Sequence, residues 1–245
     1  MIQELRRKLF ALADETYKTF NEKLVPGTGE TIGVRVPKVR ELAKEVAKED
    51  ADGFLMEMEA AEGDDFYQEE LMLWGMVIGY GKMPLEERFK RLDSWVPKIN
   101  SWAVCDCGNS TLKFMKKYPE ESFAYICKYL ESENEYEVRF AAVTLMEYFI
   151  TEEYIGRLLE IYRKISHEGY YVKMAVAWAV SVCYIKFPGQ TRRLLEKEDR
   201  QAGGLEDWTH NKAIQKIRES RRVSEEEKTY LNGLKRKISG GKMER

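Results

Sequence analysis

Apolar residues recur at spacings of three and four along most of the 245-residue chain, and this periodicity constrains the fold more than any other feature. Residues 172–180 show it, and residues 66–80 leave almost no polar side after Glu70, which predicts a buried central helix. No stretch combines two-residue alternation with hairpin turn residues. The sequence therefore predicts an all-α fold. The clearest stripe, in residues 136–150, consists of Val138, Ala141, Ala142, Leu145, Met146 and Phe149.

The positions of prolines along the chain predict helix pairs. Pro37, Pro84 and Pro119 each precede an amphipathic run, where the missing N–H of proline costs nothing. Successive pairs begin near residues 84, 119, 151 and 188, a spacing close to the roughly 40 residues of HEAT and armadillo repeats. We therefore expect about a dozen helices in a HEAT-like or armadillo-like α-solenoid, an α-α superhelix with a concave groove. Residues 1–233 are expected to form one such domain, followed by a basic C-terminal tail at residues 234–245 whose order the sequence leaves open.

Charge is divided unevenly along the chain, although the formal net charge is only −2. Residues 212–245 hold eleven basic and five acidic residues, a net charge of +6. Residues 49–70 contain no Lys or Arg and ten acidic residues: Glu49, Asp50, Asp52, Glu57, Glu59, Glu62, Asp64, Asp65, Glu69 and Glu70. The basic and the acidic segment could both be solvated helix faces. In a functional interpretation, the basic segment approaches a polyanion and the acidic segment faces away from it.

Several kinds of site find no support in the sequence. The scattered glycines form no phosphate-binding loop, and no apolar run approaches the roughly 20 residues needed to span a bilayer. Cys105 and Cys107 have neither a second cysteine pair nor histidine partners, whereas a structural zinc site needs four ligands. His167 and His210 are expected at the surface near helix ends. We expect a cytoplasmic protein with free thiols, no cofactor, no metal and no membrane association.

One local cluster is suited to chemistry. Ser101 is a plausible helix N-cap, and Trp102 and Asp106, four residues apart, would place an indole and a carboxylate on the same helix face. The structural alternative is a packing tryptophan and an aspartate bonded to a neighbouring arginine. Spacing alone favours that structural interpretation.

A second cluster lies further along the chain. Arg139 stands in the apolar segment 138–142 and needs a partner, because an unpaired buried charge is costly. A carboxylate or an external phosphate would serve. Trp178 lies in another apolar segment that begins at Tyr170.

In order along the chain, these residues resemble the AlkD-like DNA alkylation repair proteins, which are built from HEAT-like repeats. The resemblance extends from about residue 2 to about residue 220. It is carried by Ile32-Gly33-Val34-Arg35-Val36-Pro37 with Arg40, Leu42, Ala43 and Lys44, by Ser101-Trp102 to Asp106, by 137–142, by Val172-Lys173 with Ala175 and Trp178, and by 211–218.

The resemblance implies a monomeric DNA glycosylase that binds duplex DNA containing alkylated bases in its concave face and releases a cationic alkylpurine without flipping it. Trp102 and Trp178 would then be the aromatic pair at the lesion, and Asp106 the catalytic carboxylate. DNA-binding residues would be Arg139, Lys173, Lys212 and Lys216.

A second hypothesis is a noncatalytic HEAT-like module that binds DNA or a protein partner, with Trp102 and Asp106 serving structure. Two observations motivate it. The chain before residue 212 is acidic on balance, and residues 2–25 form a shorter N-terminal region than that of the proven glycosylases of the resembled family.

Overall fold

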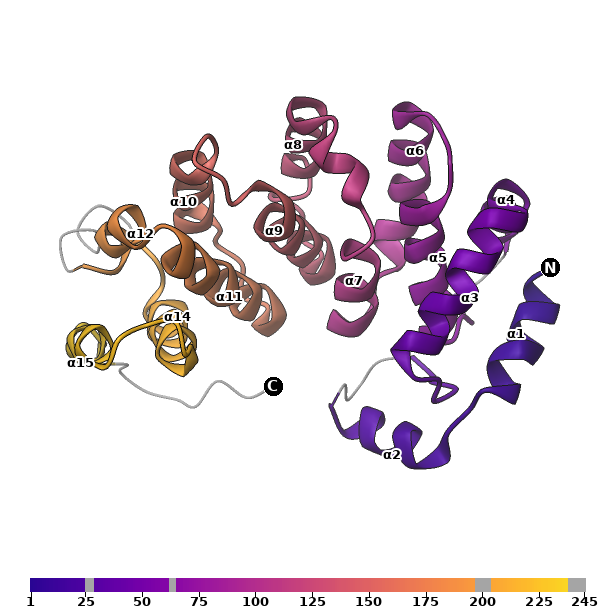
Figure 1. Cartoon of the computed structure of the whole chain (residues 1–245), viewed down its shortest axis with the longest axis horizontal. Coiled ribbons are helices and arrows are strands. Elements are labelled where there is room, and N and C mark those ends of the chain that lie inside the picture. Colours follow the sequence, from indigo (N-terminus) through magenta and orange to yellow (C-terminus); the bar gives the residue numbers. More distant parts are fainter. Residues whose placement is uncertain (25–28, 62–64, 197–203, 238–245) are drawn as a thin grey trace. The chain divides into compact units, whose positions relative to one another are not determined.

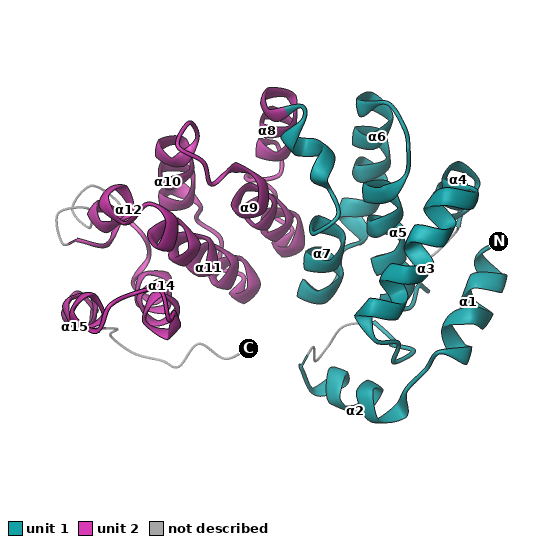
Figure 2. Cartoon of the chain, viewed as in Figure 1, with its two compact units in different colours: residues 1–118 teal, residues 119–245 magenta. Residues whose placement is uncertain are grey.

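The computed structural model describes residues 1–24, 29–61, 65–196 and 204–237, and in these it contains helices and no strand. The chain divides into two compact units, residues 1–118 and 119–245 (Figure 2). Unit 1 contains α1 (Ile2–Ala11), α2 (Glu15–Leu24), α3 (Val36–Glu49), α4 (Ala51–Ala60), α5 (Gln68–Tyr80), α6 (Leu85–Trp95), the 3₁₀ helix η1 (Val96–Lys98), α7 (Trp102–Asn109) and the 3₁₀ helix η2 (Lys113–Lys116). Unit 2 contains α8 (Pro119–Cys127), α9 (Glu135–Phe149), α10 (Ile155–Lys164), α11 (Tyr170–Lys186), α12 (Pro188–Leu195), α14 (Asp207–Glu219) and α15 (Glu225–Gly233).

Each unit is built from helices in two layers (Figure 1). In unit 1, α3, α5 and α7 pack side by side, with α4 and α6 against α5; in unit 2, α9, α11 and α14 pack side by side, with α8, α10 and α12 against them. Within each unit we call the first set the main layer (α3, α5 and α7 in unit 1; α9, α11 and α14 in unit 2) and the second set the covering layer (α4 and α6 in unit 1; α8, α10 and α12 in unit 2). Helix pairs stacked in two layers are the architecture of HEAT-like repeats, so the predicted all-α, HEAT-like class is confirmed.

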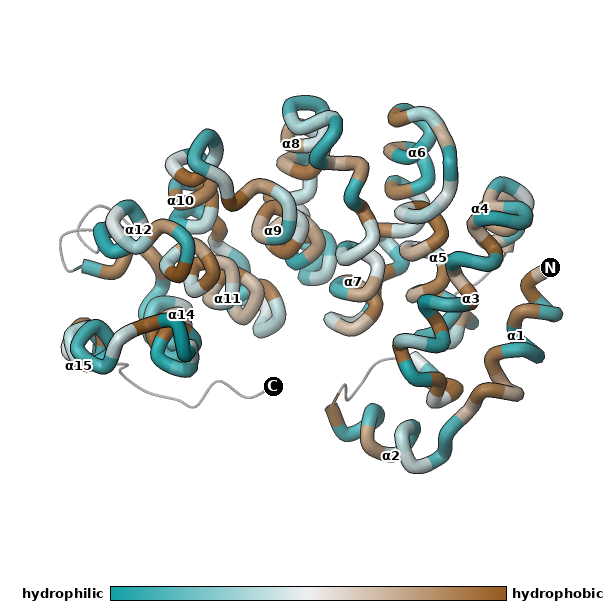
Figure 3. The backbone as a smooth tube through the Cα atoms, in the orientation of Figure 1, coloured by the Kyte–Doolittle hydropathy of each residue, from teal (hydrophilic) through white to brown (hydrophobic). Residues whose placement is uncertain are grey.

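The helix boundaries follow the local chemistry of the sequence. Pro37 lies in the first turn of α3, Pro84 is the N-cap of α6, and Pro119 begins α8. Hydrophobic residues continue all round α5 and α11, which are buried by neighbours on several sides, whereas α15 is largely hydrophilic (Figure 3). None of the helices in the described ranges is long and apolar enough to cross a membrane.

Trp95 joins three helices of unit 1. Its buried ring, at the end of α6, packs against both α5 and α7, and its Nε1 donates to the backbone oxygen of Leu71 over 2.9 Å. Gly75 of α5 and Gly108 of α7 allow this approach, because a Cβ at either position would come within 2.3 Å of the ring. The position of α7 therefore depends on two glycines.

Part of the acidic segment is internal, which corrects the interpretation of it as a solvated face. Glu69 is buried and accepts hydrogen bonds from the Thr31 hydroxyl and from the backbone N–H groups of residues 32–34, over 2.8–3.0 Å. Glu70 is also buried and forms a bidentate pair with Arg6, with N···O distances of 2.7 and 2.9 Å. These partners compensate the loss of water around each carboxylate. Arg91 similarly pairs with Asp52, Glu59 and Glu87.

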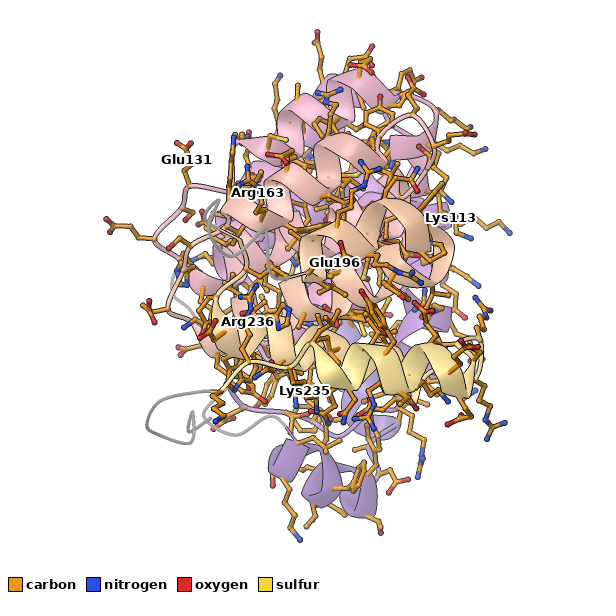
Figure 4. All side chains as sticks on the ribbon, turned by 90° about the vertical axis from the view of Figure 1, so that its left-hand side faces the viewer. Lys113, Glu131, Arg163, Glu196, Lys235 and Arg236 are labelled. Atoms are coloured by element: carbon orange, nitrogen blue, oxygen red, sulfur yellow. The ribbon has the colours of Figure 1, made fainter. Side chains whose placement is uncertain are left out.

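The beginning of the predicted C-terminal tail is held to unit 2. Asn211 of α14 exchanges two hydrogen bonds with the backbone of Arg236, each 2.8 Å long. The Arg236 guanidinium donates to the backbone oxygen of Leu205 and pairs with Asp207 over 3.3 Å; Figure 4 labels it beside Lys235. Residues 238–245 of the predicted tail lie outside the described residues, as do Glu62 and Asp64 of the acidic segment.

Candidate functional site

The start of α7 carries the first predicted cluster. The Ser101 hydroxyl accepts the backbone N–H of Val104 over 3.1 Å, so Ser101 is the N-cap that the sequence predicts. Trp102 is the first residue of the helix, and Asp106 follows one turn later; both side chains are partly exposed. At about 100° per residue, the two lie on the same face of α7. The structure therefore brings this indole and this carboxylate together at the surface of unit 1.

A polar network holds the N-terminus of α7 in place. The Ser101 hydroxyl donates to the Gln68 side-chain oxygen over 2.6 Å, and the Gln68 amide nitrogen donates to Asn100 over 2.7 Å. Gln68 is the first residue of α5 and is buried. Nothing in the spacing of Gln68 and Asn100 along the sequence indicates this pairing.

Cys107 follows Asp106 on α7, and Arg40 of α3 lies close enough to Cys107 to influence its ionisation. Burial raises the pKa of Cys107 to about 11, the positive charge of Arg40 opposes this shift, and the negative charge of Asp106 adds to it. Cys107 is therefore a neutral thiol at neutral pH and does not supply a nucleophile beside Asp106. Arg40 of α3 donates to Tyr80 over 2.9 Å and to the hydroxyl of Ser110, just after α7, over 3.1 Å.

Tyr17 of α2 also lies near the Cys107 side of α7. Burial raises the pKa of Tyr17, and nearby Cys107 and Glu69 raise it further. The Arg35 guanidinium lies 5.1 Å from the centre of the Tyr17 ring and pairs with Asp14 over 2.8 Å. Arg35, the N-cap of α3, thus holds the start of α2 through Asp14 and Tyr17.

In unit 2, three predicted DNA-binding cations lie near one another. Arg139 of α9 is buried and donates to the backbone oxygen of Tyr171 over 3.0 Å, so a carbonyl supplies one partner where a carboxylate or phosphate was expected. Lys212 and Lys216 lie one turn apart on α14. Burial lowers the pKa of Lys216, Glu219 raises it, and the positive charges of Lys212 and Arg139 lower it further. These cations form a small positive group on the main layer of unit 2.

Lys173 belongs to a different part of unit 2. Its ammonium pairs with Glu168 over 2.9 Å and lies 4.0 Å from Glu206, the N-cap of α14. It lines a cavity of about 280 Å³ between the start of α11 and the start of α14. At about 100° per residue, Lys173 and Trp178 point to sides of α11 roughly 140° apart.

Trp178 is partly exposed on α11 and shares its face with two earlier residues. Tyr171, Met174 and Trp178 are spaced by three and four residues, and all three are partly exposed. Trp178 therefore lies on the same face of α11 as Tyr171, whose backbone oxygen Arg139 contacts, about two turns further along the helix.

A chain of aromatic rings crosses the three main-layer helices of unit 2. Tyr136 of α9 stacks on Tyr171 of α11 with centroids 5.6 Å apart, Tyr171 meets Tyr170 at 5.2 Å, and Tyr170 meets Trp208 of α14 at 5.6 Å. All four side chains are partly exposed. We call Tyr136, Tyr171, Tyr170 and Trp208 the aromatic row.

The aromatic row has a signal in the sequence that the sequence analysis missed. Tyr67, Trp102, Tyr136, Tyr171 and Trp208 stand at or within two residues of the start of α5, α7, α9, α11 and α14, at intervals of 35, 34, 35 and 37 residues. Equivalent positions of stacked repeats form a row, because each repeat packs on the next in the same way.

His210 corrects another expectation. It is fully buried, and its Nε2 bonds the backbone oxygen of Leu195 over 3.0 Å, so the imidazole is part of the contact between α14 and α12 rather than a surface group. His167 is partly exposed before α11, near the surface as expected. The four cysteines are free thiols.

The predicted site residues thus form two groups within the main layer. The α7 group in unit 1 consists of Trp102 and Asp106, and the unit 2 group of Arg139, Trp178, Lys212 and Lys216, with Lys173 on another side of α11. A carboxylate beside an indole can stabilise a developing positive charge, and a group of cations can bind phosphates.

Comparison with known proteins gives one match. The model of a family described as DNA alkylation repair enzyme matches residues 5–217, which include every predicted site residue. No curated protein and no solved structure is similar enough to the chain to be matched.

Proposed function

Because this chain belongs to the DNA alkylation repair enzyme family, we propose that it binds duplex DNA containing alkylated bases and excises cationic N3- or N7-alkylpurines without flipping them from the helix. The observation that carries the proposal is the partly exposed pair of Trp102 and Asp106 on one face of α7, fixed by the Ser101 cap. The duplex would contact the main layer of each unit. A monomeric, cytoplasmic enzyme is part of this proposal.

The reaction suits so small a site. Alkylation at N3 or N7 already gives the purine a positive charge, so the C1′–N9 bond breaks with its electron pair going to N9, and the departing base becomes neutral without a general acid. The sugar is left as an oxocarbenium ion. Water adds to C1′ and loses a proton, which gives an abasic site and the free alkylpurine.

The residues have distinct roles in this reaction. The Asp106 carboxylate stabilises the oxocarbenium ion electrostatically, and the faces of Trp102 and Trp178 stabilise positive charge through their π-systems. A carboxylate at about 4 Å contributes up to about 4 kcal/mol at an effective dielectric near 20, against roughly 1–2 kcal/mol for an aromatic face. Asp106 is therefore the principal catalytic residue.

Arg139, Lys212 and Lys216 bind the DNA backbone in this proposal. Their mutual proximity supports it, because three cations outnumber the one carboxylate, Glu219, that influences Lys216, and cations grouped in this way attract a phosphate. Lys173 would reach a phosphate only by releasing Glu168.

The test is release of methylated purines from methylated duplex DNA under single-turnover conditions. Asp106→Asn should slow release by up to roughly a thousandfold, and Trp102→Ala or Trp178→Ala by roughly tenfold. Glu86→Gln, at an exposed position of α6, is the matched control and should leave the rate unchanged. Release by the wild-type protein no faster than by Asp106→Asn would eliminate excision; duplex binding retained in that case would favour the noncatalytic module.

A further inference from the structure

The aromatic row is distinct from the core of unit 2. The aromatic residues of that core, among them Phe140, Phe149 and Tyr162, are at most 7% exposed, whereas all four rings of the row are partly exposed. Burial between the helices therefore accounts for the core aromatics but not for the row. The planes of neighbouring rings are inclined by 27°, 81° and 60°, so the four partly exposed rings offer separate faces on which flat groups can stack.

The spacing of the rings determines how such a ligand binds. Neighbouring centroids in the row are 5.2–5.6 Å apart. A planar group inserted between two parallel rings needs about 7 Å, twice the contact distance of roughly 3.5 Å between stacked carbon atoms. A ligand would therefore lie on the outward faces of the row.

Charge beside the row indicates an anionic ligand. The Lys212 ammonium lies 5.8 Å from the centre of the Trp208 ring, and Arg139 donates to the backbone oxygen of Tyr171. Three carboxylates beside the row already have partners. Glu135 accepts the backbone N–H of Tyr171, Glu206 accepts those of Trp208 and Thr209, and Asp207 pairs with Arg236. Aromatic faces interleaved with cations are the pattern of surfaces that bind single-stranded nucleic acid.

We propose that the aromatic row binds unpaired bases of single-stranded DNA by stacking, while Lys212 and Lys216 contact the backbone beside it. Within a duplex, the faces of each base are covered by its neighbours, so the rings can stack only on bases that have left the helix or never paired. This inference rests on the proposed function for the identity of the ligand as DNA. It adds a second binding mode to the surface that holds the duplex.

Fluorescence anisotropy with a labelled oligothymidylate, which has no internal base pairing, tests the proposal. Tyr170→Leu and Trp208→Leu keep an apolar side chain and remove the aromatic face, and each should weaken binding about tenfold. Tyr170→Phe keeps the face and should restore wild-type affinity. Quenching of tryptophan fluorescence by the oligonucleotide should decrease in Trp208→Phe, because the indole that stacks has been replaced.

Tyr125→Leu is the matched control. Tyr125 is also partly exposed in unit 2, with the Lys128 ammonium 4.0 Å from its ring centre, but it lies on α8 in the covering layer and outside the row. The Tyr125→Leu variant should bind the oligonucleotide with the affinity of the wild-type protein.

Oligothymidylate binding that is undetectable in the wild-type protein, or unchanged in both leucine variants, would overturn the proposal. An equal loss in Tyr125→Leu would do the same. Purine release from methylated duplex, measured on the same preparations, separates the two proposals: failure of wild-type release counts against excision, whereas the row is judged by single-strand affinity alone.

Discussion

At the scale of single residues, burial decides which groups carry charge. Burial lowers the pKa of His210; the hydrogen bond to the Leu195 carbonyl opposes this effect, and the positive charge of Arg236 adds to it. Cys107 and Cys183 are held as neutral thiols in the same way, with pKa values raised to about 11 and about 12. The sequence shows these residue types but not their surroundings, which is why His210 was wrongly expected at the surface.

The state of His210 predicts how stability depends on pH. Because the pKa of His210 is lowered in the folded protein, the unfolded chain binds more protons once the pH falls below the ordinary pKa near 6.5. The contribution of His210 to stability is complete above that pH and decreases on acidification, by up to about 1.4 kcal/mol per pH unit. Urea unfolding at pH 7.5 and pH 5.5 measures this effect.

His210→Gln can keep the bond to Leu195 and should remove that part of the pH dependence. His167→Gln replaces the other histidine of the chain and should retain it. An identical pH dependence in wild type and His210→Gln would contradict the prediction.

At the scale of helices, the sequence was informative about type and boundaries. The period of three and four residues, the prolines at helix starts and the Ser101 cap are local signals, and α3, α7, α9 and α11 follow them. Contacts between distant segments were not predictable. Nothing in the spacing indicates that Glu69 binds residues 31–34 or that Gln68 binds Ser101.

The contact between α5 and α7 gives a prediction at this scale. In Gly108→Ala, the new Cβ would come within 2.3 Å of the Trp95 ring, so the helices must separate or the ring must move. Overpacking of this kind costs about 1–3 kcal/mol, measurable as a lower urea midpoint. Purine release should slow as well, because α7 carries Trp102 and Asp106.

Gly156→Ala is the control within a helix. No atom lies within 4 Å of a Cβ at this position of α10, and alanine favours the helix by up to about 1 kcal/mol. Destabilisation as large as that of Gly108→Ala would show that the tight contact at Trp95 is not the cause.

At the scale of the whole molecule, uneven charge makes DNA affinity depend on salt. Each phosphate neutralised should contribute about −0.9 to the slope of log affinity against log salt concentration for duplex DNA. Lys216→Gln should therefore make the slope shallower by about one. Lys90→Gln removes the same charge from an exposed position of α6 and should leave the slope unchanged. Equal slopes for wild type and Lys216→Gln would remove Lys216 from the proposed DNA contacts.

The repeat pattern was only partly visible in the sequence. Proline spacing indicated helix pairs of the correct length, whereas the aromatic residues that recur at the starts of α5, α7, α9, α11 and α14 went unnoticed. They differ in identity between Tyr and Trp, and their meaning depends on the register in which the repeats stack. The position of an aromatic residue within each repeat therefore indicates the repeat architecture better than sequence identity between repeats does.

The first turn of α5 ties three distant segments of unit 1 into one cooperative body. Gln68, Glu69 and Glu70, consecutive in the chain, hold the start of α7, residues 31–34 and α1 respectively. Fraying of this single turn would release all three together, since the anchoring side chains belong to three consecutive residues. The alignment of the proposed reacting groups therefore depends on a stretch of chain that contains none of them.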